Sequence, residues 1–230
     1  MQIFRNLSPE LLESLWLTLR LAFVVMLFLL VVSIPLAYVL SRCKWRGVVV
    51  IEALVSLPIV LPPTVIGFYL LMLFSPQHWL GGFWLQLTGE TLTFTFKGLV
   101  LGSVLYSLPY AVQPILGAFK TVNAEFLELA LTLGATRWQT LRYVLLPLSL
   151  RGLGVAAILS FAHTLGEFGV VVMLGGSIPG KTKVASIALY DEVQNLNYEA
   201  AHAFALILLL LAFIMLIAMT LVQRRIAFDK

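Results

Sequence analysis

Five long apolar stretches leave this chain few ways to fold. A helix needs about 20 mainly apolar residues to cross the hydrocarbon core of a bilayer, and each stretch reaches that length. Hydrophobic residues form 60% of the sequence and charged residues only 11%, against roughly 25% charged in a soluble domain. The sequence therefore predicts an all-α integral membrane protein whose single domain, residues 1–230, has five spans. They are expected at residues 14–40, 50–74, 98–119, 149–174 and 200–222.

The positive charges predict how the chain is oriented. Cytoplasmic loops carry the excess of Lys and Arg. One set of loops and ends holds Arg42, Lys44, Arg46, Lys120, Arg137, Arg142, Arg151, Arg224, Arg225 and Lys230, and the other holds Arg5, Lys97, Lys181 and Lys183. Because the number of spans is odd, the larger set places the C-terminus in the cytoplasm and the N-terminus outside. The net charge of +4 is thus a signal of topology and gives no indication of nucleic-acid binding.

A polar insert at residues 123–147 separates the third and fourth apolar stretches. Asn123 is a favourable N-cap, and Glu125 and Glu128 would lie near the positive end of the helix that follows. Gly134 is placed to end that helix in the left-handed conformation. The first half of the insert therefore predicts a short helix that a glycine terminates.

A second helix is expected directly afterwards. Residues 136–139 have the spacing of a capping box, and the helix is expected to run to Pro147, where a backbone hydrogen bond is lost. Together the two short helices predict a knob at the membrane surface. The orientation places this loop, residues 120–147, in the cytoplasm.

The spans contain prolines and polar residues that an ordinary membrane anchor does not need. Three prolines between residues 58 and 63 predict a kink in the second span. Irregular backbone survives in a bilayer only against protein or a water-filled cavity, and intramembrane ionisable groups favour a functional path. The candidate path residues are Pro62, Pro63, Thr64, Ser107, Gln113, Thr164 and Glu167. Helix packing alone is an equally open interpretation of these residues.

The two outer loops differ in character. Residues 75–97 have the composition of a plain surface connection. Residues 175–198 join a glycine-rich turn to a moderately amphipathic segment, 184–196, which is compatible with a short helix along the outer surface. Lys181 and Lys183 in this loop are either solvated or in contact with an acidic partner.

Several kinds of chemistry are not indicated. Cys43 is the only cysteine, and the three histidines are far apart with no second ligand at metal spacing, so neither a disulfide nor a metal site is expected. The sequence has no Gly-x-Ser-x-Gly elbow. Residues 175–182 match the letters Gly-x-x-x-x-Gly-Lys-Thr, but they follow an apolar span in an outer loop and not a strand, so they do not indicate a phosphate-binding loop. We therefore expect no catalytic residues and no cofactor, and any ATP must be bound by another subunit.

The insert resembles the Glu-Ala-Ala loop of ABC importer permeases. Glu128 and Ala130, then Gly134, then Val144-Leu-Leu-Pro147 stand at the family's spacing, with Leu129 in place of the middle alanine. The resemblance implies a type I importer fold with five spans, in the inner membrane of the cell. It also implies that Glu128, Ala130, Gly134 and Pro147 couple the chain to an ATPase subunit.

Three further blocks resemble the molybdate permeases, with sulfate and tungstate permeases as near relatives. They lie at residues 57–71, 165–169 and 177–182. The implied function is to move an oxyanion, molybdate first, with sulfate or thiosulfate and tungstate as the alternatives. The implied partners are a second copy of the chain, a pair of ATP-binding cassette subunits and an extracytoplasmic oxyanion-binding protein.

Two other classes of protein were considered. An ion-coupled carrier or channel would need inverted repeats or a pair of acids in the membrane, and the spans offer only Glu167. A membrane-anchored helix-turn-helix regulator would need a third helix and more basic groups than residues 123–147 contain. Copurification with a nucleotide-binding subunit would separate an importer from both.

Overall fold

The computed structural model describes residues 8–43 and 45–225, and all regular structure in these two ranges is helical. This agrees with the predicted fold class. Arg5, Lys44 and Lys230, which entered the charge count, lie outside the described residues.

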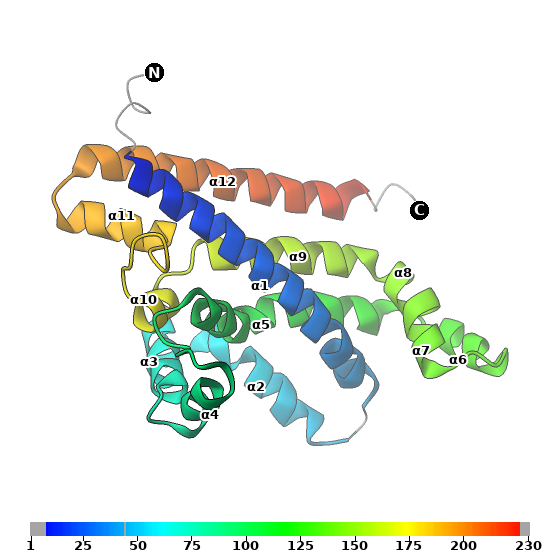
Figure 1. Ribbon diagram of the computed structural model, residues 1–230. Helices are drawn as coiled ribbons and strands as arrows, with labels where there is room; N and C mark the ends of the chain where they lie inside the picture. The colour runs from blue at the N-terminus through cyan, green and yellow to red at the C-terminus, as the bar shows by residue number, and fades with distance from the viewer. Residues whose placement is uncertain (1–7, 44, 226–230) are drawn as a thin grey trace.

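Three helices form the centre of the bundle. Helices α1 (Pro9–Arg42), α5 (Phe96–Thr121) and α9 (Leu150–Leu165) pack against one another (Figure 1). Lipid tails are as apolar as leucine, so helices associate in a bilayer through close packing at small residues. A Cβ atom added at Gly152 of α9 would lie only 2.3 Å from the Cβ atom of Ala118 on α5. The glycine thus allows these two helices to approach closely.

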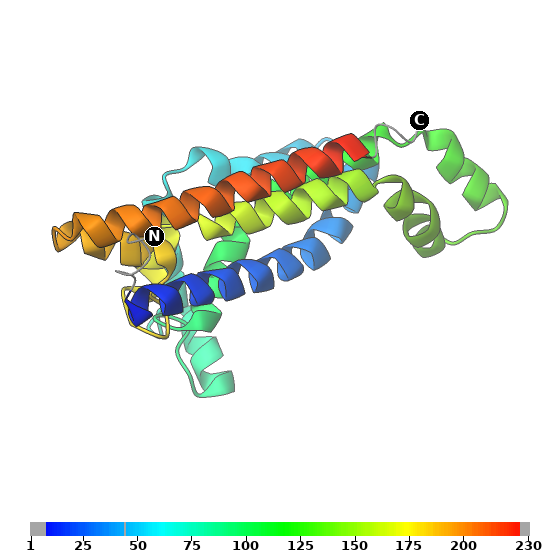
Figure 2. The ribbon, with the colours of Figure 1, turned by 90° about the horizontal axis from the view of Figure 1, so that it is seen from above.

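Helix α12 (Tyr198–Arg225) lies along α9 on the outside of the bundle, as both ribbon views show (Figures 1 and 2). Its first turns are anchored by buried residues such as Phe204, whereas Phe213 and Ile214 further along are 59% and 60% exposed. An apolar surface of this kind suits contact with lipid rather than with water. α12 therefore forms the lipid-facing side of the bundle.

Among the described residues, three helices are long and apolar enough to cross a membrane: Pro9–Arg42, Phe96–Thr121 and Tyr198–Arg224. Two bent pairs raise the number to five if each pair forms one span. One pair is α2 (Val48–Val60) with α3 (Pro63–Phe74), bent by 111°, and the other joins Arg137–Leu148 to Leu150–Leu165, bent by 76°. The five spans and their limits stay a prediction.

The ends of the bundle are easily told apart. The first turn of α1 and the last turn of α12 lie at opposite ends. The segment from α6 (Ala124–Thr132) to α8 (Leu146–Leu148) projects beyond the end where α12 finishes (Figure 1). This arrangement suits an odd number of crossings. It places the polar insert at the same end as the C-terminal turn of α12.

The proline-rich segment breaks instead of kinking. Pro58 lies within α2, but the helix ends at Val60, and Leu61 and Pro62 have ψ angles of 139° and 135°. Each of these two residues precedes a proline, which disfavours the helical region of φ/ψ space. The expectation of one kinked helix over residues 50–74 was therefore wrong, because two successive residues are held extended.

Residues 75–97 contain a helix that we did not expect. Helix α4 (Trp79–Thr88) turns back against the end of α3, and a Cβ atom added at Gly81 would lie 2.2 Å from the carbonyl oxygen of Phe74. Gly81 therefore lets α4 pack closely against the end of α3. Gly89, with φ of 74°, ends α4 in the left-handed conformation.

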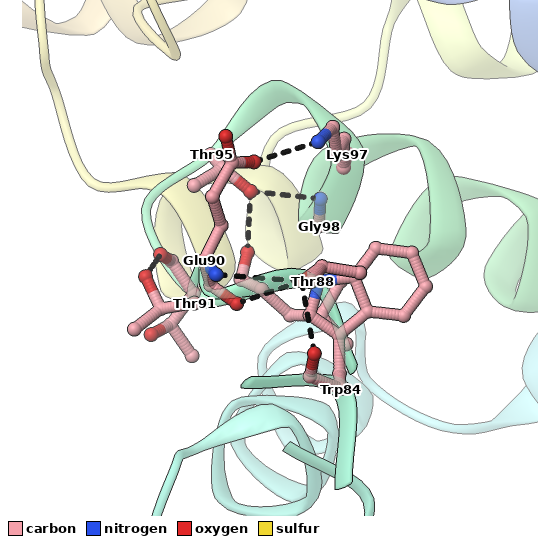
Figure 3. A network of polar contacts seen from close by, with 9 residues as sticks. Trp84, Thr88, Glu90, Thr91, Thr95, Lys97 and Gly98 are labelled. Atoms are coloured by element: carbon pink, nitrogen blue, oxygen red, sulfur yellow. Dashed lines mark hydrogen bonds and ion pairs between the residues drawn. The ribbon is translucent and has the colours of Figure 1, made fainter. Parts of the chain in front are cut away.

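The connection from α4 to α5 is held by its own side chains (Figure 3). Thr95 accepts a hydrogen bond from the backbone N–H of Gly98 at 3.2 Å and so caps α5. Lys97 Nζ lies 2.6 Å from a carboxylate oxygen of Glu90, and this hydrogen bond and the lysine charge lower the pKa of Glu90. All these contacts join residues no more than seven positions apart.

The fourth apolar stretch is also interrupted. Helix α9 ends at Leu165 and α10 (Gly169–Gly175) begins after a gap that contains Glu167. The span expected over residues 149–174 is thus divided between two helices.

The expected helix in the last outer loop is present as α11 (Ala185–Gln194), packed against α1 and α12. Lys183 forms an ion pair of 2.9 Å with Asp191 of the same segment. This contact matches neither interpretation of the lysine, because the side chain is paired rather than solvated and its acidic partner belongs to the chain itself.

Candidate functional site

The polar insert folds as two short helices with a turn between them. Helix α6 (Ala124–Thr132) begins at the predicted N-cap, where the Asn123 side chain accepts a hydrogen bond from the backbone N–H of Glu125 at 3.1 Å. Glu125 lies in the first turn, where the helix dipole favours a negative charge. The start of the first helix is therefore fixed by local contacts.

Gly134 ends this helix with φ of 85°, as predicted. The backbone N–H of Gly134 donates to the Leu131 carbonyl, and that of Ala135 donates to the Ala130 carbonyl, both at 3.0 Å. These two bonds form a Schellman motif, which satisfies carbonyls that the helix end leaves free. Ala130 thus contributes its backbone to the turn that Gly134 makes possible.

The second helix also starts as predicted. Thr136 and Gln139 form a reciprocal capping box with bonds of 2.7 and 3.2 Å, and α7 (Arg137–Thr140) follows. It continues through a π-helical turn, Leu141–Leu145, into α8 (Leu146–Leu148). Pro147 lies within α8, so the helix ends one residue later than expected, and the bend of 76° comes after it.

Several large apolar side chains of this loop are exposed. Six of them, on α6 and the segment after it, are between 47% and 80% exposed: Phe126, Leu129, Leu131, Leu133, Trp138 and Tyr143. Exposed apolar side chains in such number favour contact with a partner. Leu127, Leu141 and Leu145 form the buried side of the loop and hold it together.

Two grooves flank α6. One, of about 470 Å³, is lined by the end of α1 and by Glu128, Arg42 and Arg137. The other, of about 660 Å³, is lined by Phe126 of α6 and by Pro147 near the start of α9. Glu128 and Pro147 thus lie on different sides of the same helix.

Inside the bundle, polar side chains of α5 and α9 meet. Ser107 Oγ lies 2.8 Å from Nδ1 of His163 and 3.2 Å from Oγ1 of Thr164, while Thr164 donates to the Ser160 carbonyl at 3.0 Å. The ring of Tyr110 stacks on His163 with centroids 3.8 Å apart. The buried hydroxyls of Ser107 and Thr164 thus have partners, as buried polar groups require.

Glu167 lies one turn beyond Thr164 in the gap between α9 and α10. Its side chain is 4% exposed, and neither carboxyl oxygen has a hydrogen-bond partner in the described part of the chain. Its backbone carbonyl accepts a hydrogen bond of 2.5 Å from the Ser186 hydroxyl at the start of α11. The segment around Glu167 is therefore linked to an outer helix, but its carboxyl is not.

Helix α10 packs against the start of α3. A Cβ atom added at Gly169 would lie 2.6 Å from Pro63 Cβ and 3.1 Å from the backbone nitrogen of Thr64. On the facing side, a Cβ atom at Gly67 would lie 2.9 Å from Met173 Cβ. The two broken segments of the second and fourth apolar stretches thus touch through glycine and proline.

The structure brings most of the candidate path residues together around α10, but Gln113 is separate. Its side-chain amide donates to the Ser56 hydroxyl of α2 at 2.7 Å, on an exposed face. Lys120 and Glu52 pair across the same two helices at 3.0 Å. Pro62 is the exposed residue that precedes α3.

His163, Ser103 and Tyr110 belong to the buried polar layers but were not among the predicted site residues. Ser103 lies four residues before Ser107, so both hydroxyls occupy the same face of α5. That spacing was available in the sequence. The stacking of His163 on Tyr110 depends on how α5 and α9 cross, which the sequence pattern does not provide.

Comparison with known proteins identifies the class. Residues 30–228 match the family described as binding-protein-dependent transport system inner membrane components. The chain is 46% identical over 213 residues to the molybdenum transport system permease protein ModB of Azotobacter vinelandii, covering 93% of this chain and 94% of the relative. It is 34% identical to the sulfate transport system permease protein CysT of Escherichia coli K12, covering 95% and 78%. The chain belongs to this family of permease subunits, and it is not an enzyme.

Two crystal structures of bacterial alginate ABC transporters share the fold. One gives a TM-score of 0.78 at 20% identity and covers 97% of this chain and 83% of that chain. The other, a complex with a periplasmic protein that holds an alginate pentasaccharide, gives 0.74 at 22% identity and covers 95% and 80%. The all-α architecture is therefore that of an ABC importer permease.

Proposed function

We propose that this chain is the membrane permease of an ATP-driven importer that carries an oxyanion, with molybdate as its first cargo. The observation that carries the proposal is the capped helix-Gly-helix loop with its exposed apolar side chains. Such a loop is rigid, because each helix end is satisfied by its own neighbours. ATP-driven closure of a partner could move it as a unit and pull on α9 through Pro147.

An ATPase subunit is the proposed partner of the loop. The exposed apolar side chains, centred on Leu129 and Leu133, would fill a groove on that subunit, and Glu128 would face basic groups at its rim. The leucine at position 129 suits this role, since an apolar side chain there packs as an alanine does. Copurification of a nucleotide-binding subunit with the chain tests this step.

A second copy of the chain is proposed to complete the path. The face formed by α2 and α5 carries the pairs Ser56–Gln113 and Glu52–Lys120. Polar and charged groups at membrane depth are expensive against lipid and usually line a cavity or a protein interface. Two such faces would enclose a path for an anion, and crosslinking between engineered cysteines on α2 of two copies would measure their proximity.

A binding protein is proposed to deliver the cargo at the opposite end from the coupling loop. The alginate importer in complex with its periplasmic protein is a precedent for the fold, since the same arrangement of helices accepts such a partner. Selectivity among tetrahedral dianions would then belong to that protein, because hydroxyls and amides in the path distinguish them poorly.

The orientation can be tested with the single thiol of the chain. Cys43 is exposed, next to the basic end of α1, and is proposed to face the cytoplasm. A membrane-impermeant thiol reagent added to intact cells should leave it unmodified, while a permeant reagent should label it. Labelling from outside would invert the topology and remove the coupling loop from the ATPase.

The cargo can be tested in vesicles that contain the permease, its ATPase and its binding protein. We expect ATP-dependent uptake of molybdate, inhibited strongly by tungstate and more weakly by sulfate. Sulfate uptake that molybdate fails to inhibit would replace molybdate with sulfate and keep the importer. Stimulation by only a sugar or an amino acid would reject the oxyanion.

A further inference from the structure

The gap between α9 and α10 contains two buried polar groups that the bundle leaves without partners. The carboxyl of Glu167 is one, and the hydroxyl of Ser103, which is fully buried on α5, is the other. The Ser103 hydroxyl lies close enough to interact with the carboxyl, but neither group has a hydrogen-bond partner in the described part of the chain. Two adjacent buried groups with free hydrogen-bonding capacity are uncommon in a packed core, and together they can hold a small ligand.

The surroundings of the carboxyl favour a positive occupant. Glu167 follows the last turn of α9. There the backbone N–H of Gly166 donates a hydrogen bond to the Ala162 carbonyl, and that of Glu167 donates to the Thr164 carbonyl, both at 3.3 Å. Carbonyls at a helix C-terminus carry a partial negative charge. In broken membrane helices, such ends, together with a carboxylate, bind protons or monovalent cations.

Within the described residues, no basic side chain forms an ion pair with Glu167. The three ion pairs among the described residues join Lys97, Lys120 and Lys183 to other carboxylates. Tyr106 on α5 interacts electrostatically with Glu167, and the Tyr106 ring also lies against His163 on α9. A tyrosine is neutral at ordinary pH and cannot compensate a carboxylate.

The other neighbours of the gap are already engaged. His163 is held by Ser107, stacks on Tyr110 and lies at a tilt beside Tyr106. From α11, the Ser186 hydroxyl donates to the backbone carbonyl of Glu167 and not to its carboxyl. From α3, Pro63 contacts Gly169 and contributes no charge. An ionised Glu167 would thus be a buried charge without compensation, which costs several kcal/mol.

We propose that this gap is a binding site for one small cation, a proton or a monovalent metal ion, held by the Glu167 carboxyl and the Ser103 hydroxyl. A bound proton forms an O–H bond on the carboxyl, which then donates to Ser103 Oγ. A metal ion would instead take oxygens from both side chains and from the end of α9. Either occupant removes a negative charge from a site one turn beyond the Ser107 layer. The proposal does not depend on which cargo the permease carries.

Infrared spectroscopy of the full chain in lipid nanodiscs tests the site directly. Spectra of the wild type and of Glu167→Gln are compared in choline, sodium and potassium chloride at neutral pH, and bound sodium and potassium are measured on the same samples by atomic emission. We expect the wild type, in choline, to show a carboxylic-acid C=O band that Glu167→Gln lacks. Glu90→Gln, which changes an exposed carboxylate, serves as the matched control and should retain that band.

The salts separate the two occupants. A band that sodium and potassium leave unchanged assigns the site to a proton. A band that either salt abolishes, or about one ion per chain retained by the wild type and lost in Glu167→Gln, assigns it to a metal ion. Equal spectra and equal ion content in the two proteins in every salt would overturn the proposal. Should Glu167→Gln fail to fold, Ser103→Ala replaces it, and it should shift the same band or release the same ion.

Discussion

Two places where the chain interrupts a helix next to a glycine, the turn at Gly134 and the gap at Glu167, are built in opposite ways. The turn at Gly134 is closed by residues within six positions of one another, and the glycine has no atom within 4 Å of an added Cβ. The gap around Glu167 is held by Pro63 of α3, by Ser186 of α11 and, through Thr164, by Ser107 of α5. The first turn carries its own shape, whereas the second depends on where three other helices lie.

This difference suggests a division of roles. A locally closed loop can move as one body without losing its shape, which suits the transmission of force from a partner. A gap that other helices hold together changes whenever those helices move, which suits a place where the path opens and closes. Changes at Gly169 should therefore disturb the bundle, and changes at Gly134 should disturb mainly coupling.

The largest effect is expected from Gly169→Val. Its side chain would meet Pro63 and the backbone of Thr64, which cannot yield as a flexible side chain does. Overpacking of this kind costs about 1–3 kcal/mol. We expect a lower thermal unfolding midpoint in detergent and loss of uptake in vesicles. Gly166→Ala is the matched control, because it lies in the same gap with ordinary contacts of 3.9 Å or longer. Equal unfolding midpoints for Gly169→Val and the control would show that α3 and α10 do not need this contact.

Gly134→Val should have the next largest effect, mainly on coupling. The left-handed conformation costs about 1–2 kcal/mol for a residue with a side chain, while the space around the position is open. We expect the variant to insert, to unfold at a midpoint lowered less than that of Gly169→Val because the strain is confined to the loop, and to lose ATP-driven uptake and ATPase attachment. Gly134→Asn should retain most activity, since asparagine tolerates this conformation. Normal uptake by Gly134→Val would show that the turn is not a coupling element.

The accuracy of the sequence predictions follows the same division. The caps at Asn123 and Thr136 and the turn at Gly134 were predicted, because each depends on residues within one turn of helix. The gap at Glu167 was not, since the contact that stabilises it joins Gly169 to Pro63, more than a hundred residues away in the chain. Residues 75–97 were predicted to be a plain surface connection. The close contact between Gly81 and the Phe74 carbonyl forms only because α4 folds back against α3, which the sequence does not show.

The candidate path residues lie in two different parts of the bundle. Ser107, Thr164 and Glu167 were chosen from the sequence for their polarity at membrane depth, and the structure brings all three to one region. Gln113 was chosen on the same ground but lies on the face shared by α2 and α5. The polarity of these residues identified all of them as candidates. Only the packing of α5 shows that Gln113 faces α2 while Ser107 faces α9.

Glu128→Lys should have a smaller effect than either glycine variant. Glu128 lines a groove with Arg42 and Arg137, so a lysine there would gather three positive charges. The change is worth about 0.2–1 kcal/mol, or at most about five-fold in affinity for the ATPase. A pull-down titration with the purified ATPase measures it, and Glu128→Gln should give a smaller loss. An unchanged affinity in both variants would place the ATPase contact elsewhere on the loop.

The smallest effect is expected at the outer turn between α4 and α5. Like the Gly134 turn, it is closed by contacts among its own residues, but it is proposed to contact no ATPase. Lys97 lowers the pKa of Glu90 through a hydrogen bond and its charge, yet both side chains are exposed. Because the folded state lowers this pKa, the pair stabilises the fold at neutral pH, and that contribution disappears as the pH falls through the lowered pKa. Lys97→Gln should therefore unfold at a slightly lower temperature than the wild type at pH 7, and the two should converge in acid, with uptake unchanged. A difference that grows on acidification would mean that Lys97 acts through another group, and a loss of uptake would show that local closure alone does not make a segment independent of transport.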